Sequence, residues 1–291
     1  MRVTMKKKFL LSLLITTMAW LAIVVYYYSQ SDQTLAVVFL DVGQGDSLLI
    51  KAPQGQRVLI DSGPDQSVLT ELANYLPWWD RQLDLIILTH AHADHLTGFN
   101  YVLDHYRVQR AIINSADYDS ETYQNFLAKL KAKQVETTIM IEPLVIDLAP
   151  CSLRLLYPLA NTVLTDNLNN TSIVSRLSCG QLDWLLTGDI ENKAEAEILA
   201  SNVNLQSEFL KVAHHGSDTI TSRQWLQAVQ PELAIISVSA DNHFGLPDQT
   251  VLDRLQFLGI DVWRTDQRGS LQMVSSDLQT WQIKEPKLLF F

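Results

Sequence analysis

The chain has 291 residues, and 47% of them are hydrophobic, which leaves room for one large domain or two small ones with an ample core. Its formal charge is −10, and without the four basic residues near the N-terminus 18 basic side chains face 32 acidic ones, a balance of −14. That balance argues against a protein that binds nucleic acid through a broad basic surface.

The N-terminal segment predicts a membrane anchor. Phe9–Tyr27 is an almost uninterrupted apolar run without a charge, long enough to span a bilayer as a helix. Four basic residues precede it: Arg2, Lys6, Lys7 and Lys8. The positive-inside rule therefore leaves the N-terminus in the cytoplasm. A cleaved signal peptide is the alternative, but Tyr26–Tyr28 offers no small-residue cleavage site and suits an interfacial anchor.

We therefore expect a single-pass protein of the cell membrane with three parts. These are a cytoplasmic basic segment over residues 1–8, a transmembrane anchor over 9–28 and an extracytoplasmic domain over 35–291.

The first part of that domain predicts strands followed by a helix. The expected strands are 35–40, 47–52, 57–60 and 83–88, and an apolar stripe predicts a helix over 65–76. The turn Asp41–Asp46 has two open interpretations. Its backbone approaches a binding pocket, or Gly43 and Gly45 merely permit the turn.

Four potential metal ligands follow the strand 83–88 within six positions: His90, His92, Asp94 and His95. In an extended loop His90 and His92 point the same way and can grip one cation, while Asp94 and His95 start a helix and face the other side of the pocket. Imidazoles and carboxylates without thiolate suit Zn or Mn rather than Ca or Mg. The pattern predicts a two-metal site.

Alternating helices and strands continue to the C-terminus. Helices are expected over 96–106, 121–133, 190–200, 222–229 and 251–258, and strands over 110–114, within 135–157, and over 173–177, 182–186, 209–213, 233–238 and 262–283. His105 lacks partners at ligand spacing and is interpreted as structural. Cys151 and Cys179 fall in strand-like segments; they could pair outside the cell, but we expect buried free thiols.

Two strand ends carry further candidate ligands. Asp189 follows the strand 182–186, where its carboxylate can bridge two cations or cap the next helix. His214 and His215 follow the strand 209–213. Because adjacent residues of an extended chain face opposite sides, we expect one of them to bind metal, and favour His214 because it directly ends the strand.

The H-x-H-x-D-H pattern of residues 90–95 resembles the metallo-β-lactamase superfamily. Three other blocks, 41–47, 186–189 and 214–217, are similar to the extracellular hydrolase domain of the ComEC competence (DNA-uptake) family, over about residues 35 to 283. The resemblance implies an α/β fold, a metallo-β-lactamase-like four-layer αββα sandwich with the metal site at one rim of the paired sheets.

The same resemblance marks candidate substrate contacts: Asn170, Ser172, Ser217 and His243. Asn170 and Ser172 sit where many superfamily members carry another metal-binding histidine, a departure that the ComEC family shares. Their alternative role is turn chemistry. The ComEC family usually has a histidine where this chain has Leu246, and His243 is a candidate substitute.

The expected mechanism is metal-dependent hydrolysis. Two divalent ions would share Asp189 and a bridging hydroxide. Binding to the ions would lower the pKa of the water that gives this hydroxide toward ~7. We expect Asp94 and Asp189 to be catalytic; His90 and His92 would bind the first ion, and Asp94, His95 and a histidine of the pair 214–215 the second.

Three functions remain open. The first is a membrane-anchored phosphodiesterase or nuclease, with single-stranded DNA among its candidate substrates. The second is a hydrolase of another ester, such as phosphorylcholine on envelope polymers. The third is a non-enzymatic, metal-stabilised module of an uptake complex. The ComEC family's multi-helix channel region is absent from this sequence, so we do not expect this chain alone to transport DNA.

Overall fold

The computed structural model describes residues 2–29, 34–116, 118–160, 162 and 167–284. The chain divides into two compact units, Met1–Gln33 and Thr34–Phe291. The first unit holds helix α1 (Arg2–Ser29), whose described apolar side chains, from Phe9 to Ile23, are exposed. Within the described residues, no helix combines the length and apolar character needed to cross a membrane. The side chains of Tyr26–Tyr28 lie outside the described part.

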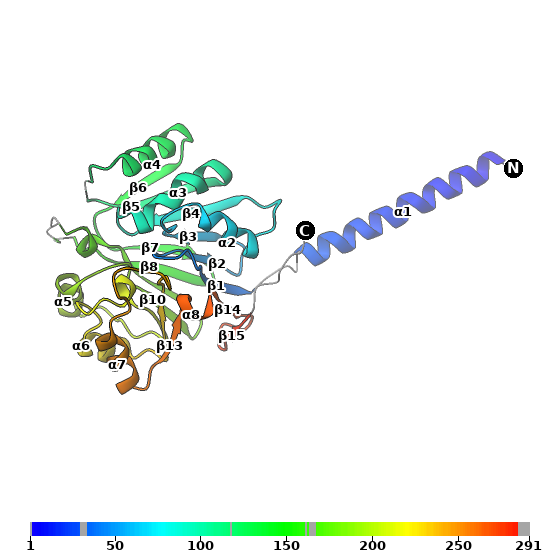
Figure 1. Ribbon diagram of the computed structural model, residues 1–291. Coiled ribbons are helices and arrows are strands. Elements are labelled where there is room, and N and C mark those ends of the chain that lie inside the picture. The colour runs from blue at the N-terminus through cyan, green and yellow to red at the C-terminus, as the bar shows by residue number, and fades with distance from the viewer. Residues whose placement is uncertain (1, 30–33, 117, 161, 163–166, 285–291) are drawn as a thin grey trace. The chain divides into compact units, whose positions relative to one another are not determined.

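The second unit contains two sheets (Figure 1). The first has eight strands in the order β15-β14-β1-β2-β3-β4-β5-β6, with bounds β1 Leu35–Phe39, β2 Leu48–Lys51, β3 Arg57–Ile60, β4 Gln82–Leu88, β5 Arg107–Asn114, β6 Glu136–Met140, β14 Leu271–Ser275 and β15 Gln282–Ile283. Strand β14, from the last part of the chain described, lies antiparallel to β1, in a register from Leu35 opposite Ser275 to Phe39 opposite Leu271.

The second sheet has seven strands in the order β13-β12-β11-β10-β9-β8-β7. Their bounds are β7 Leu144–Leu148, β8 Cys151–Tyr157, β9 Val174–Cys179, β10 Leu182–Leu186, β11 Phe209–Lys211, β12 Leu233–Ile236 and β13 Asp261–Arg264. The region 135–157, expected to hold two or three short strands, supplies β6, β7 and β8.

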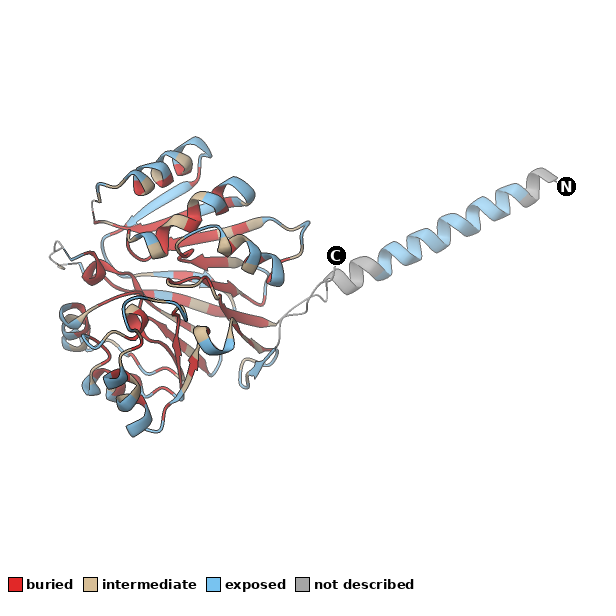
Figure 2. Ribbon diagram, viewed as in Figure 1, coloured by how far each residue is buried: buried red, intermediate tan, exposed pale blue. Residues whose placement is uncertain are grey.

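Three apolar cores separate four layers. Because successive strand residues face opposite sides, Val37 and Phe39 of β1 enter the core between the sheets while Val38 enters the core beneath the first helices. Those helices are α2 (Ser67–Tyr75), α3 (Ala93–His105) and α4 (Glu121–Ala132). The outer face of the second sheet packs against α5 (Asn192–Ala200), α6 (Arg223–Val229) and α7 (Gln249–Phe257), and α8 (Thr265–Arg268) follows β13. The expected αββα arrangement of two sheets flanked by helices is confirmed, and Figure 2 shows buried strands with helices exposed on their outer sides.

The strand directions define two edges of the first sheet. β1 and β2 are antiparallel, β2 and β3 are antiparallel, and β3, β4 and β5 are parallel. The strands β1, β3, β4 and β5 therefore all begin at one edge, here called the entry edge. The C-terminal ends of β3 and β4 lie at the opposite edge, here called the site edge, and lead into Asp61 and His90.

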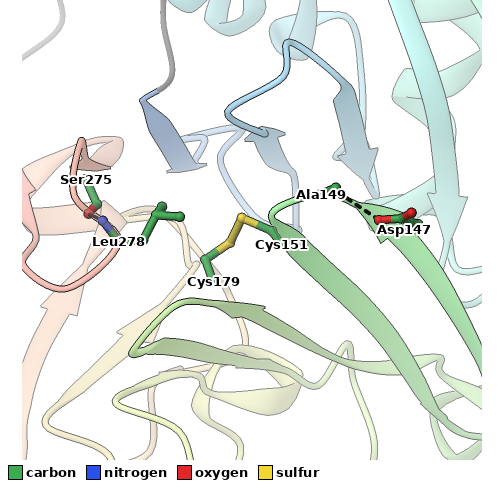
Figure 3. The surroundings of a disulfide bond; sticks show 6 residues. All are labelled: Asp147, Ala149, Cys151, Cys179, Ser275 and Leu278. Atoms are coloured by element: carbon green, nitrogen blue, oxygen red, sulfur yellow. Dashed lines mark hydrogen bonds between the residues drawn. A yellow bond between two sulfur atoms is a disulfide. The ribbon is translucent and has the colours of Figure 1, made fainter.

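The expectation of free thiols was wrong. Cys151 and Cys179 form a disulfide between the neighbouring strands β8 and β9 (Figure 3). The antiparallel register places Ser152 opposite Ser178, so that the two cysteines come to face each other. Strand register between distant segments is not visible in the sequence, which is why the pairing was missed.

Candidate metal centre

The metal-ligand loop connects β4 to α3 at the site edge. β4 ends at Leu88, and its parallel neighbours leave the following residues at the rim of the sheet. The buried His90 has its Nε2 atom 3.1 Å from Nδ1 of the half-buried His92, and its ring centroid lies 4.2 Å from that of His95. Asp94 and His95 occupy the first turn of α3, as expected.

Four of the predicted ligands converge. One ligand atom from each of Asp94, His95, Asp189 and His215 lies within 4.8 Å of the others. Nε2 of His215 is 3.2 Å from Oδ2 of Asp94 and 3.4 Å from Oδ2 of Asp189, and Nε2 of His95 is 3.1 Å from the same Asp189 oxygen. The two sheets each contribute two of these four residues.

The two oxygens of Asp189 have different neighbours. Oδ2 faces His95 and His215, whereas Oδ1 accepts a hydrogen bond from the backbone N–H of His214 at 3.1 Å and lies 3.4 Å from Nζ of Lys211. Helix α5 begins later, at Asn192, with Glu191 as its N-cap residue. Asp189 therefore belongs to the site, and the capping alternative is not what the structure shows.

The structure brings His215, and not the favoured His214, into the cluster. Both residues have positive φ angles, 47° and 53°, in the short 3-10 segment Ala213–Gly216. The chain is therefore not extended here, and alternation from the strand end does not apply. His214 instead lies with Nδ1 3.5 Å from Oε1 of Glu191 and Nε2 3.5 Å from the side chain of Asn169.

Two residues that sequence reasoning missed contact the ligands of the cluster, Asp61 at His95 and Lys211 at Asp189. Asp61 follows β3; its Oδ2 lies 2.7 Å from Nδ1 of His95, and its oxygens accept hydrogen bonds from the N–H and hydroxyl of Thr89. Lys211 ends β11, is buried, and forms an ion pair with Asp46. Each is a charged residue that closes a buried apolar strand beside a strand leading to a ligand, which is the signal that could have revealed them.

The turn Asp41–Asp46 approaches the pocket, which resolves the earlier alternative. A Cβ atom on Gly45 would lie 2.2 Å from the carbonyl oxygen of Asp94, so the close contact requires glycine. The N–H of Asp46 donates to that same carbonyl at 3.2 Å, and the buried Asp46 carboxylate meets Lys211.

The predicted substrate contacts separate into three kinds. Asn170 is engaged structurally, because its Oδ1 accepts hydrogen bonds from the N–H groups of Glu191 and Ala194 at the start of α5. Ser172 is buried and accepts a hydrogen bond from the N–H of Asp189 at 3.2 Å, so it positions the ligand. Ser217 and His243 are accessible, Ser217 beside Thr219 and His243 on the loop between β12 and α7.

Burial and neighbouring charges shift the pKa values of the site histidines in opposite directions. Burial and the neighbouring His95 lower the pKa of His90 well below its usual range. Burial also opposes the charge of His95, but Asp189, Asp61 and Asp94 outweigh it and raise the pKa of His95 well above its usual range. Likewise, burial opposes ionisation of Asp189, yet His95, His215 and Lys211 hold its pKa well below the usual range. The site thus concentrates negative charge around imidazoles.

The residues present fit divalent cations. Nε2 of the buried His95 lacks an aligned hydrogen-bond partner among the described residues, although Oδ2 of Asp189 is close. Nε2 of His95 and Nε2 of His215 face the same Asp189 oxygen, an arrangement typical of ligands to a common ion. Nδ1 of His95 faces Asp61 and Nδ1 of His215 faces the Ser237 carbonyl at 2.8 Å, the outer contacts that orient ligating imidazoles.

The Metallo-beta-lactamase superfamily model matches residues 40–240. The chain belongs to this superfamily. Its members are generally metal-dependent hydrolases. The metallo-beta-lactamase fold protein YhfI of Bacillus subtilis superposes with a TM-score of 0.52 at 15% identity, over 79% of this chain and 96% of that one. CmlA, a diiron β-hydroxylase of Streptomyces venezuelae, superposes with a TM-score of 0.53 at 11% identity, over 79% of this chain and 52% of that one. At such identities the likeness shows the fold alone.

Curated relatives confirm the resemblance to competence proteins. ComE operon protein 3 of Bacillus subtilis is 33% identical, covering 81% of this chain and 32% of that protein. Competence protein ComA of Neisseria gonorrhoeae is 31% identical, covering 83% and 32%. The chain therefore spans about a third of the length of these relatives.

Proposed function

We propose that this superfamily member is a metal-dependent phosphodiesterase held at the outer face of the cell membrane. The observation that carries the proposal is the convergence of Asp94, His95, Asp189 and His215 at the site edge. Two bound divalent ions, Zn or Mn, would supply an activated water and stabilise charge that develops on a phosphoryl oxygen.

The protein's own residues prepare this chemistry. Asp61 accepts from Nδ1 of His95, which leaves Nε2 of that ring facing the pocket. The Ser237 carbonyl does the same for His215. Lys211 and the backbone of His214 hold Oδ1 of Asp189, which orients Oδ2 toward the two imidazoles. His90 and His92 lie beside this cluster and would hold the first ion.

The phosphodiester assignment follows the competence relatives, which suggest single-stranded DNA as one substrate and an uptake complex as one setting. A specific observation favours a second candidate. The balance of −14 repels a polyanion except where bound cations create a local positive field. A small envelope ester such as phosphorylcholine carries less charge and avoids this repulsion.

Hydrolysis by the metal-loaded full chain tests these candidates. We expect cleavage of bis-p-nitrophenyl phosphate and of single-stranded DNA at low salt, with loss of both in Asp189→Ala. The exposed Asp253→Ala variant is the matched control and should keep both activities. Cleavage of the small diester alone favours the envelope ester, and cleavage of neither favours the non-enzymatic module.

The proposed location rests on the sequence of α1 and on the disulfide. Basic residues Lys6–Lys8 before an apolar helix favour a cytoplasmic N-terminus, and a Cys151–Cys179 bridge persists in oxidising compartments. Protease added to cells stripped of wall or outer membrane should digest the domain. Protection until lysis would reverse the orientation.

A further inference from the structure

Two neighbouring tryptophans lie exposed on the turn between α2 and β4. Trp78 is 64% exposed and Trp79 61%, and their rings contact each other edge to face with centroids 5.6 Å apart. Large aromatic side chains are usually buried, and indoles left in solvent at a fixed position are typical of contact surfaces.

The turn that carries the two tryptophans is held in place by hydrogen bonds. The N–H of Asp80 donates to the carbonyl of Pro77 at 2.9 Å, and Nη1 of Arg57 donates to Oδ1 of Asp80 at 2.6 Å. Nε of Arg81 donates to the carbonyl of Trp78 at 3.3 Å. These bonds fix the backbone around the two indoles, so their exposure is a property of the fold.

Strand register places this turn at the entry edge. It directly precedes β4, whose start lies at the same edge as Leu35, the first residue of β1. In the sequence, α1 ends at Ser29 and β1 begins at Leu35, so the link between them is short. A bilayer that held α1 would therefore lie within reach of this edge.

The entry edge is also rich in basic side chains, although the domain is strongly acidic. Four exposed ones lie where β4 and β5 begin and where α4 leads into β6: Arg81, Arg107, Lys131 and Lys133. Of the acidic residues near these strand starts, Asp80 is paired with Arg57 and Asp104 with Lys129, Asp84 accepts from the backbone N–H of Arg57, and Glu136 is exposed. Indoles flanked by cations match the headgroup region of an anionic bilayer.

We infer that Trp78 and Trp79, with the basic residues of the entry edge, form a contact surface for an anionic phospholipid bilayer. The inference builds on the proposed membrane location. It also directs the site edge, at the opposite ends of the strands, away from the bilayer and toward substrate. A nucleic acid that stacked on these indoles would lie at the wrong end of the sheet for the metal cluster, which favours the lipid.

Quenching of tryptophan emission by brominated lipids tests the surface. For this test, Trp20→Phe is introduced into the full chain to remove the tryptophan of α1. The protein is then reconstituted into vesicles of phosphatidylglycerol and brominated phosphatidylcholine. We expect quenching that falls by about half or more in Trp78→Ser/Trp79→Ser, since interfacial indoles sit at headgroup level. Phe244→Ser, at a side chain 74% exposed on the loop between β12 and α7, is the matched control and should leave quenching unchanged.

Other outcomes separate this inference from the proposals beneath it. Flotation of the vesicles in a density gradient reports whether the chain is bound to them. If the chain floats with the vesicles but the double variant is quenched as much as the parent, the contact surface is overturned while the membrane anchor stands. A chain that does not float overturns both. Single-stranded DNA that changes the emission of Trp78 and Trp79 while lipid does not would make the turn a nucleic-acid site and overturn the inference. Hydrolysis of bis-p-nitrophenyl phosphate in the same samples reports on the enzyme independently.

Discussion

Nε2 of His215 lies 3.2 Å from Oδ2 of Asp94, although the two residues are 121 positions apart in the chain. Asp94 opens α3 beside the first sheet, and His215 follows β11 of the second. The candidate metal centre is thus held by both sheets at once.

The adjacent histidines provide the sharpest test of this geometry. His215→Ala should lose bound metal and hydrolysis, because its Nε2 faces Asp94 and Asp189, whereas His214→Ala should keep its metal. Elemental analysis of both purified variants measures the difference. Full metal in His215→Ala, or loss confined to His214→Ala, would contradict the arrangement.

Asp189→Ala should remove most of the bound metal from a protein that otherwise holds about two ions per chain. The reason is that its Oδ2 faces two imidazoles at once. The comparison is with Asp253→Ala, an exposed carboxylate on α7. Elemental analysis that found Asp189→Ala fully loaded would remove this residue from the centre.

Lys211→Met should lower the free energy of unfolding of the metal-free protein by about 3 kcal/mol, since it leaves buried carboxylates without their cation. Lys211 is only 5% exposed and lies between Asp46 and Asp189. Urea unfolding measures the loss. Lys193→Met, which breaks an exposed pair with Glu197, should change stability by about 0.5 kcal/mol or less. Equal effects would show that the buried pair is unimportant.

Metal binding should release protons. In the metal-free protein, acidic neighbours outweigh burial and raise the pKa of both His95 and His215, so each ring keeps its proton to a higher pH than a free histidine and a metal must displace it there. Affinity should therefore rise with pH. Calorimetry in two buffers of different ionisation enthalpy counts the released protons, and identical heats in both would contradict the expectation.

The same raised pKa values set the pH dependence of the metal-free fold. A proton held more tightly in the folded state stabilises it fully below the unfolded histidine pKa of about 6.5. That contribution is lost as pH rises through the folded-state values. The urea midpoint of the metal-free chain should therefore fall as pH rises above about 6.5. His95→Gln should make the midpoint depend less on pH.

Removal of the disulfide should be costly. Cys151→Ala/Cys179→Ala opens a loop with a sequence separation of 28 and should lower stability by about 2–4 kcal/mol. Chemical unfolding checks the loss, and thiol labelling of the unreduced parent should find no reactive cysteine. Two labelled thiols in protein recovered from outside the cytoplasm would show that the bridge does not form there.

Local patterns in the sequence predicted most of the strands and helices and much of the centre, whereas the αββα arrangement was predicted from the resemblance to the metallo-β-lactamase superfamily. The strand ending at Leu88 and the spacing from His90 to His95 are local signals, as is Asp189 after β10. Asp61 and Lys211 act through partners brought close by sheet packing, and their only local signal is that each is a charged residue at the end of a buried apolar strand. The choice between His214 and His215 depended on positive φ angles, which residue types alone did not indicate.

The pairing of β1 with β14 has a consequence for synthesis. A ribosome releases Leu35–Phe39 long before their partners on one side, Leu271–Ser275. Between the synthesis of these two strands, one flank of the apolar strand β1 stays open to unwanted pairing with other chains. We therefore expect a nascent chain of this protein to be prone to such pairing until β14 is made and covers that flank of β1.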